Sequence, residues 1–176
     1  MVPDTVLRLV AVQKALEDII VPLLSDDADF AREQLALIIK SIALMRKQIP
    51  LEYAFHVHDA KAFATFADEL ADKLPTSCLA RASLATAVER VRIIAPPQVP
   101  DRQALEDAVQ ALRAEIERVI DDDSADAATF AAIGPVVLAH TRRQTLLERA
   151  WVADTGFERD AESLPTPRNL IYGAVS

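Results

Sequence analysis

The stretch LALIIKSIALMRKQI, residues 35–49, is the most apolar part of the sequence. Large apolar side chains recur in it at three- and four-residue spacing, the pattern of one helix face, at Leu35, Ile38, Ile42, Met45 and Ile49. Leu37, Ile39 and Leu44 widen this face, so the helix is expected to be covered on more than one side. The stretch therefore predicts the centre of a helical bundle, with the other amphipathic segments packed around it.

The composition of the whole chain also favours helices. Hydrophobic residues make up 51% of the 176 residues, and only three residues are glycine. β-branched residues never alternate with polar residues over the length of a strand, which argues against a sheet. We predict an all-α fold of five or six mostly antiparallel helices, with one domain at 1–153 and an irregular C-terminal tail at 154–176.

Turn residues and prolines divide the chain into expected helices. These helices should cover about 5–24, 28–49, 51–74, 78–94, 101–120 and 125–152. Pro22 should loosen the end of the first helix, because proline lacks a backbone donor. Residues 96–100 read as a stiff proline-rich linker inside the domain. Gly134-Pro135 should interrupt the last helix and kink it.

Two parts of the chain share short elements in the same order. Residues 11–48 contain AVQ, an acidic turn, FA, an apolar helix and RKQ, and residues 108–144 contain AVQ, an acidic turn, FA, an apolar helix and RRQ. Two interpretations stay open. Either the bundle consists of two duplicated helical hairpins, or helices of similar composition resemble one another without common origin.

The charge of the chain limits its partners. The formal net charge is −8 and the isoelectric point about 4.9, the wrong sign for binding nucleic-acid phosphates or an anionic membrane surface. The single cysteine, Cys78, can form no internal disulfide, and we expect a small buried hydrophobe. A cytoplasmic protein with neither nucleic acid nor membrane as partner is expected.

The first fifty residues carry a family resemblance. They contain VLRLV at 6–10, LE at 16–17, IVPLL at 20–24 and FAR at 30–32, followed by the apolar helix. This pattern resembles an uncharacterised family of small helical bacterial proteins found beside, or fused to, aminoglycoside-phosphotransferase-like kinases, often near acyl-CoA dehydrogenases. The family offers no catalytic motif to transfer. The resemblance implies an accessory role near kinase or acyl-CoA chemistry.

The segment LEYAFHVHDAKAF, residues 51–63, is the first candidate site. On a helix, Glu52, His56 and Asp59 continue the line of Phe63 and Phe66, so two carboxylates and an imidazole share one face. Groups at this spacing could hold a metal or act as an acid–base pair. Alternatively, the first turn is exposed and these groups are solvated. The Glu-x-x-His signature of di-iron bundles is missing from the sequence, so we expect no metal and no cofactor.

His140 and Gln144 interrupt the apolar face of the last helix. The simpler interpretation is a core histidine and glutamine whose hydrogen bonds are satisfied. In the alternative, they meet Glu52, His56 or Asp59 across the bundle and form a small-ligand pocket between the third and sixth helices.

The function predicted from these observations is a non-enzymatic accessory or protein-interaction module, expected to be a homo-oligomer. The sequence contains no Gly-rich phosphate loop, G-x-S-x-G or H-E-x-x-H, and it has many apolar helix faces. The alternative is a helical small-ligand or metal-binding protein, conceivably an enzyme, that uses the candidate residues. The apolar end of the tail, residues 170–172, should dock either on its own chain or on a second copy.

Overall fold

The computed structural model describes residues 4–95, 101–122, 126–156 and 158–173. Within these ranges all regular structure is helical and no strand occurs. Six of the helices in the described residues have eleven residues or more, which confirms the predicted all-α fold. The residues group into two compact units, Tyr53–Leu146 and Met1–Glu52 with Leu147–Ser176, which are described separately.

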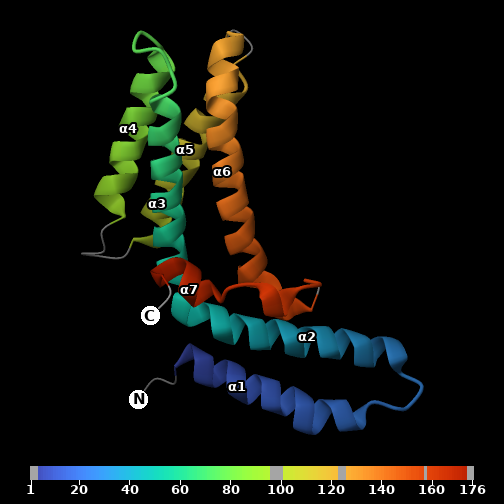
Figure 1. Cartoon of the computed structure of the whole chain (residues 1–176). Coiled ribbons are helices and arrows are strands. Elements are labelled where there is room, and N and C mark those ends of the chain that lie inside the picture. Colours follow the sequence, from blue (N-terminus) through green and yellow to red (C-terminus); the bar gives the residue numbers. More distant parts are fainter. Residues whose placement is uncertain (1–3, 96–100, 123–125, 157, 174–176) are drawn as a thin grey trace. The chain divides into compact units, whose positions relative to one another are not determined.

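The unit Tyr53–Leu146 contains α3 (Glu52–Ala71), α4 (Leu79–Ile94), α5 (Arg102–Ile120) and most of α6 (Ala127–Val152). Figure 1 shows these helices as a bundle. All four contribute to one cluster of buried apolar side chains, which includes Phe66, Leu70, Leu84, Val88, Leu105, Leu112, Ile116 and Ile133. Burial of this surface is the main force holding the unit together.

The helix α5 shows how the sequence places an element in this unit. Its start is capped by Asp101, whose side chain accepts a hydrogen bond of 2.9 Å from the backbone N–H of Ala104. Its apolar residues recur at helical spacing, and Leu105 and Leu112 are almost completely buried. The opposite face is polar and carries several side chains of the site described below.

The other unit begins with a helical hairpin. The helix α1 (Thr5–Ala15) continues into a π turn at Leu16–Ile20 and a 3-10 turn at Val21–Leu23. It runs beside α2 (Asp29–Gln48) in the opposite direction, as Figure 1 shows. Pro22 lies in the 3-10 turn, which agrees with the expected loosening of the helix end, because Pro22 has no N–H to continue the α-helical pattern.

The expectation that 35–49 forms the covered centre of the bundle is wrong. Only Leu35 and Ile42 of α2 are buried, whereas Ile38 is 50% exposed and Met45 43% exposed. The largest buried cluster lies in α3–α6 instead. Apolar character shows what a face would gain by burial, but it does not show that a partner helix within the chain covers it.

The expected interruption at Gly134-Pro135 is also wrong. The helix α6 continues through both residues from Ala127 to Val152. A proline removes one backbone hydrogen bond, and the bonds before and after it keep this long helix continuous. The proposed linker at 96–100 lies outside the described residues. The single domain at 1–153 and the duplicated hairpins stay predictions.

The tail lies against its own chain in the described structure. It forms 3-10 turns at Ala153–Thr155 and Ala161–Ser163 and a short helix α7 (Pro167–Tyr172). Tail residues and α2 residues together line a cavity of about 330 Å³. The guanidinium of Arg149 donates to both carboxylate oxygens of Glu158, at 2.8 and 2.7 Å, and holds the pKa of Glu158 at about 2.

Among the helices described, none combines the length and the apolar character needed to cross a membrane.

Candidate functional site

Asp59 connects three helices of the unit Tyr53–Leu146. Its side chain extends from α3 and is largely buried, with the residue 7% exposed. Arg113 of α5 donates from Nη2 to Oδ2 at 3.1 Å, and Gln144 of α6 donates from Nε2 to Oδ1 at 2.9 Å. A buried carboxylate is costly unless it is paired and hydrogen-bonded. Both oxygens of Asp59 meet this condition.

His140 lies beside this network, within the aromatic part of the core. Its ring stacks on Phe66 at a centroid distance of 4.1 Å and meets Phe63 edge-on at 4.8 Å. The residue is 6% exposed, and Nε2 has no hydrogen-bond partner among the described residues. Burial, together with the positive charge of Arg143, lowers the pKa of His140, and the opposing effect of Asp59 is smaller.

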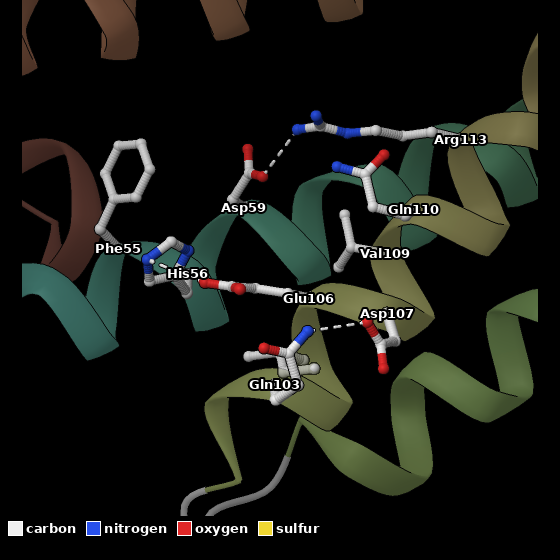
Figure 2. Close-up of a pocket in the computed structure, with 10 residues that line it drawn as sticks. Phe55, His56, Asp59, Gln103, Glu106, Asp107, Val109, Gln110 and Arg113 are labelled. Carbon is white, nitrogen blue, oxygen red and sulfur yellow. Dashed lines mark hydrogen bonds and ion pairs between the residues drawn. The ribbon is translucent and has the colours of Figure 1, made fainter.

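A cavity of about 400 Å³ opens between α3 and α5, on the polar side of α5 (Figure 2). Its lining from α3 is Phe55, His56 and Asp59. The lining from α5 is Gln103, Leu105, Glu106, Asp107, Val109, Gln110 and Arg113. The lining therefore combines one phenyl ring and two aliphatic side chains with a larger number of charged and amide groups.

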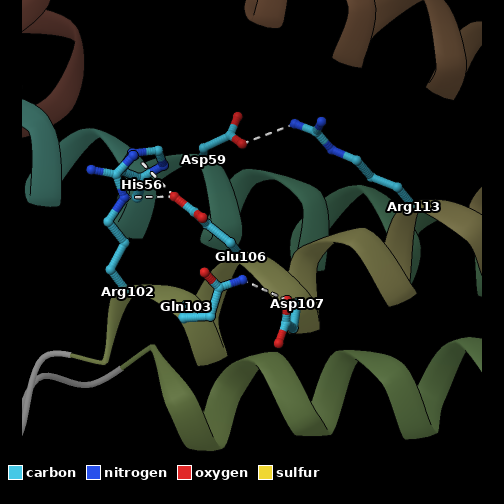
Figure 3. A network of polar contacts seen from close by, with 7 residues as sticks. All are labelled: His56, Asp59, Arg102, Gln103, Glu106, Asp107 and Arg113. Carbon is cyan, nitrogen blue, oxygen red and sulfur yellow. Dashed lines mark hydrogen bonds and ion pairs between the residues drawn. The ribbon is translucent and has the colours of Figure 1, made fainter.

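A polar network surrounds part of the cavity (Figure 3). Oε1 of Glu106 accepts a hydrogen bond of 2.6 Å from Nε of Arg102 and lies 3.9 Å from Nε2 of His56. The neutral amide of Gln103 donates to Asp107 at 2.9 Å. Arg113 places its guanidinium over the ring of Phe63, 4.2 Å from the centroid. These contacts orient the side chains before any ligand binds.

The structure brings together some of the residues expected from the sequence. Gln144 and Asp59 are directly bonded, as the alternative interpretation of the last helix required. His56 lines the cavity, whereas His140 packs on Phe63 and Phe66. Glu52 is the first residue of α3 and belongs to the other compact unit.

The location of the cavity differs from the expected one. We expected a pocket between the third and sixth helices, but the lining comes from α3 and α5. The helix α6 contributes Gln144 as a partner of Asp59 and no lining residue. A ligand-binding role for the five candidate residues stays a prediction.

Sequence reasoning missed the residues that α5 contributes. Gln103, Glu106, Gln110 and Arg113 follow one another at three- and four-residue spacing on its polar face. This spacing was available as a signal. It is indistinguishable from an ordinary solvated helix face until the position of α3 is known.

Over the described ranges, no group of three or more His, Cys, Asp or Glu side chains is arranged to hold a metal ion. Glu106 and His56 bring one carboxylate oxygen and one imidazole nitrogen to 3.9 Å from each other.

A second candidate surface lies on α1, in the other unit. No residue of α1 is buried. Leu7 is 62% exposed and Ile19, in the following π turn, is 58% exposed. Ala11 and Ala15 lie between them at four-residue intervals and are also exposed. We call Leu7, Ala11, Ala15 and Ile19 the α1 row.

The chain was compared with protein-family models, curated proteins and solved structures, and it matches none of them.

Proposed function

We propose that this chain is a protein-interaction module that associates with a second copy of itself through the α1 row. The observation that carries the proposal is the exposure of this row on a helix with no buried residue. Residues four apart lie on one face of a helix. The π turn contains more residues per turn than an α-helix, so it rotates Ile19 back toward that face.

The order of side-chain sizes along the α1 row favours a second copy as the partner. The row reads large, small, small, large. In an antiparallel pair of α1 helices, Leu7 of one copy faces Ile19 of the other, and Ala11 faces Ala15. Small residues at the crossing point let two helices approach closely, while the large residues close the ends. Such self-complementarity is the requirement for a twofold-symmetric interface.

The charges beside the row agree with the antiparallel direction. Arg8 follows Leu7 at one end, and Asp18 precedes Ile19 at the other. Antiparallel pairing brings the Arg8 end of one helix to the Asp18 end of its partner. Parallel pairing would place like charges at the same level, which is unfavourable.

The expected association is modest in strength. Burying Leu7 and Ile19 from each copy contributes on the order of 1–2 kcal/mol per side chain, because each is already partly covered. This gain must exceed an association cost of roughly 4 kcal/mol or more. The four side chains of the two copies therefore leave at most about 4 kcal/mol of net binding free energy, which corresponds to a weak dimer of about millimolar affinity, so the test requires a high protein concentration.

Light scattering of concentrated solutions, measured without a column, tests the proposal. Ala11→Glu places a charge in the middle of the row without disfavouring the helix, and it should give a monomer at concentrations where the unchanged chain is dimeric. Ala82→Glu is the matched control, since Ala82 is an exposed alanine of α4. An unchanged chain that is monomeric, or a dimer that survives Ala11→Glu, would contradict the proposal and point to a different partner or surface.

A further inference from the structure

The cavity beside the tail has the size of a small-molecule site. Its volume of about 330 Å³ lies within the range of roughly 300–1,000 Å³ found for such sites. Its walls come from the end of α2, the end of α6 and the tail, all of which belong to one compact unit. We call it the tail cavity. It shares no residue with the α1 row, so an inference about its ligand does not depend on the proposed association.

Most of the lining of the tail cavity is apolar. Leu44, Leu51 and Leu164 contribute aliphatic side chains from three segments of the chain, and Trp151 contributes an indole ring. The remaining apolar residues are small or rigid, and they are Ala150, Ala153, Ala161, Pro165 and Pro167. An apolar molecule that enters the cavity removes these side chains from water, which is favourable.

The charged side chains of the lining leave one positive charge without an opposite partner. Nζ of Lys47 lies 2.8 Å from Oδ2 of Asp154, so these two charges offset one another. The third charged residue is Arg168, and no carboxylate of the described residues lies within ion-pair distance of it. Its guanidinium lies 5.6 Å from the centroid of the Tyr172 ring, a contact that does not neutralise the charge.

A carboxylate is the group that fits this guanidinium. The contact with the Tyr172 ring is made through the electron-rich face of the ring and uses none of the five N–H donors of Arg168. Guanidinium groups bind carboxylates through two parallel charge-assisted hydrogen bonds. A neutral hydroxyl would gain one hydrogen bond without compensating the charge, and an ammonium group would be repelled.

From these observations, we propose that the tail cavity binds a small carboxylic acid with an apolar body. The carboxylate pairs with Arg168, and the apolar body lies against Trp151 and Leu164. Because α2, α6 and the tail all contribute to the walls, the bound acid also holds the tail in place.

Titration of the ¹⁵N-labelled full-length chain by NMR tests the site with three probes. They are 3-phenylpropionate, the neutral 3-phenyl-1-propanol, which lacks the charge, and acetate, which lacks the apolar body. Trp151 is the single tryptophan of the chain, so its indole N–H signal reports directly on the cavity. The phenylpropionate should shift this signal with the strongest affinity of the three, and acetate should not shift it at the same concentrations. Added salt should weaken phenylpropionate binding and leave the alcohol nearly unaffected.

Two matched variants of the tail separate the site from general surface charge. Arg168→Gln should weaken phenylpropionate binding by about tenfold, the equivalent of about 1.4 kcal/mol, without changing the affinity for the alcohol. Arg159→Gln removes the same charge from an exposed tail residue that does not line the cavity, and it should leave both affinities unchanged. The amide spectrum of each variant reports whether the fold is retained.

Several outcomes would overturn the inference. An unshifted Trp151 signal would show that the cavity takes no such acid, and acetate binding as tightly as phenylpropionate would reduce the contact to surface ion pairing. Equal affinities for the acid and the alcohol, or equal losses in Arg168→Gln and Arg159→Gln, would contradict the role of Arg168. Should Arg168→Gln lose its fold, the three probes and the salt dependence of the unchanged chain still decide the question.

Discussion

Asp59 uses its two carboxylate oxygens to hold α5 and α6 against α3. It pairs with Arg113, whose side chain remains 35% exposed, and accepts from Gln144. The pair is neither a surface ion pair nor a fully desolvated one. Its contribution therefore comes mainly from satisfying a buried carboxylate, a group that is expensive to leave without partners.

Asp59→Asn should destabilise the chain by about 1–3 kcal/mol. The amide presents an NH₂ group to one of the two donors, so that donor loses its acceptor. Urea unfolding followed by circular dichroism measures the effect. Glu117→Gln, which removes one exposed charge, should change the free energy of unfolding by less than about 0.5 kcal/mol, and equal effects of the two variants would contradict this role for Asp59.

His140 should make stability depend on pH below about 6.5. Its pKa is lowered in the folded chain, chiefly by burial, whereas an unfolded histidine titrates near 6.5. Above that pH both states are neutral and stability is unaffected. As the pH falls through 6.5 the unfolded chain binds the proton first, so stability decreases until the lower folded pKa is reached.

Thermal unfolding between pH 8 and pH 5 measures this dependence. In His140→Phe, which keeps an aromatic ring between Phe63 and Phe66, the decrease between pH 6.5 and pH 5 should be smaller than in the unchanged chain. Identical pH profiles for the two chains would show that His140 is not the group responsible.

Sequence patterns anticipated only part of these residue contacts. Asp59 and Gln144 each interrupt an apolar helix face, so their meeting could be formulated as one of two alternatives. Arg113 and Glu106 do not interrupt an apolar face, because they lie on the polar face of α5. Their roles follow from the position of α3 against α5, and a single sequence contains no direct record of such a position.

For individual helices, capping residues and prolines predicted the structure better than apolar character did. Asp101 caps α5 and Pro22 lies where the first helix loses its α-helical pattern, as the sequence predicted. Both effects involve only neighbouring backbone groups. The apolar richness of α2 was misleading, because burial depends on partners far away in the chain. Gly134-Pro135 was misleading for a related reason. The backbone hydrogen bonds in the surrounding turns stabilise α6 by more than the loss of one hydrogen bond at Pro135 destabilises it.

The tail is held to the end of α6 by the pair of Arg149 and Glu158. The guanidinium bonds both carboxylate oxygens and lowers the pKa of Glu158 to about 2. Because the folded pKa is lowered, the pair stabilises the folded tail above the ordinary value of about 4.5. This contribution is lost as the pH falls from there toward 2.

Carbon-detected NMR of the Glu158 carboxyl group checks this contact. The titration midpoint should lie near 2 in the unchanged chain and return toward the ordinary value of a glutamate in Arg149→Gln. A midpoint near the ordinary value in the unchanged chain would mean that the pair is not formed in solution.

In the whole molecule, the chain has separate candidate binding surfaces in its two units. The unit with α3–α6 has a buried core and a polar cavity. The unit that contains α1 exposes an apolar row on a helix without buried residues. A surface of this kind gains most from a partner, which we propose to be a second copy of the chain.

Sedimentation equilibrium of the unchanged chain over a wide concentration range tests the association most directly. A twofold interface is closed, so the weight-average mass should rise from the 19.3 kDa of one chain toward twice that value and then level off. A mass that stays at 19.3 kDa at every concentration, or one that grows past the dimer without limit, would contradict the account.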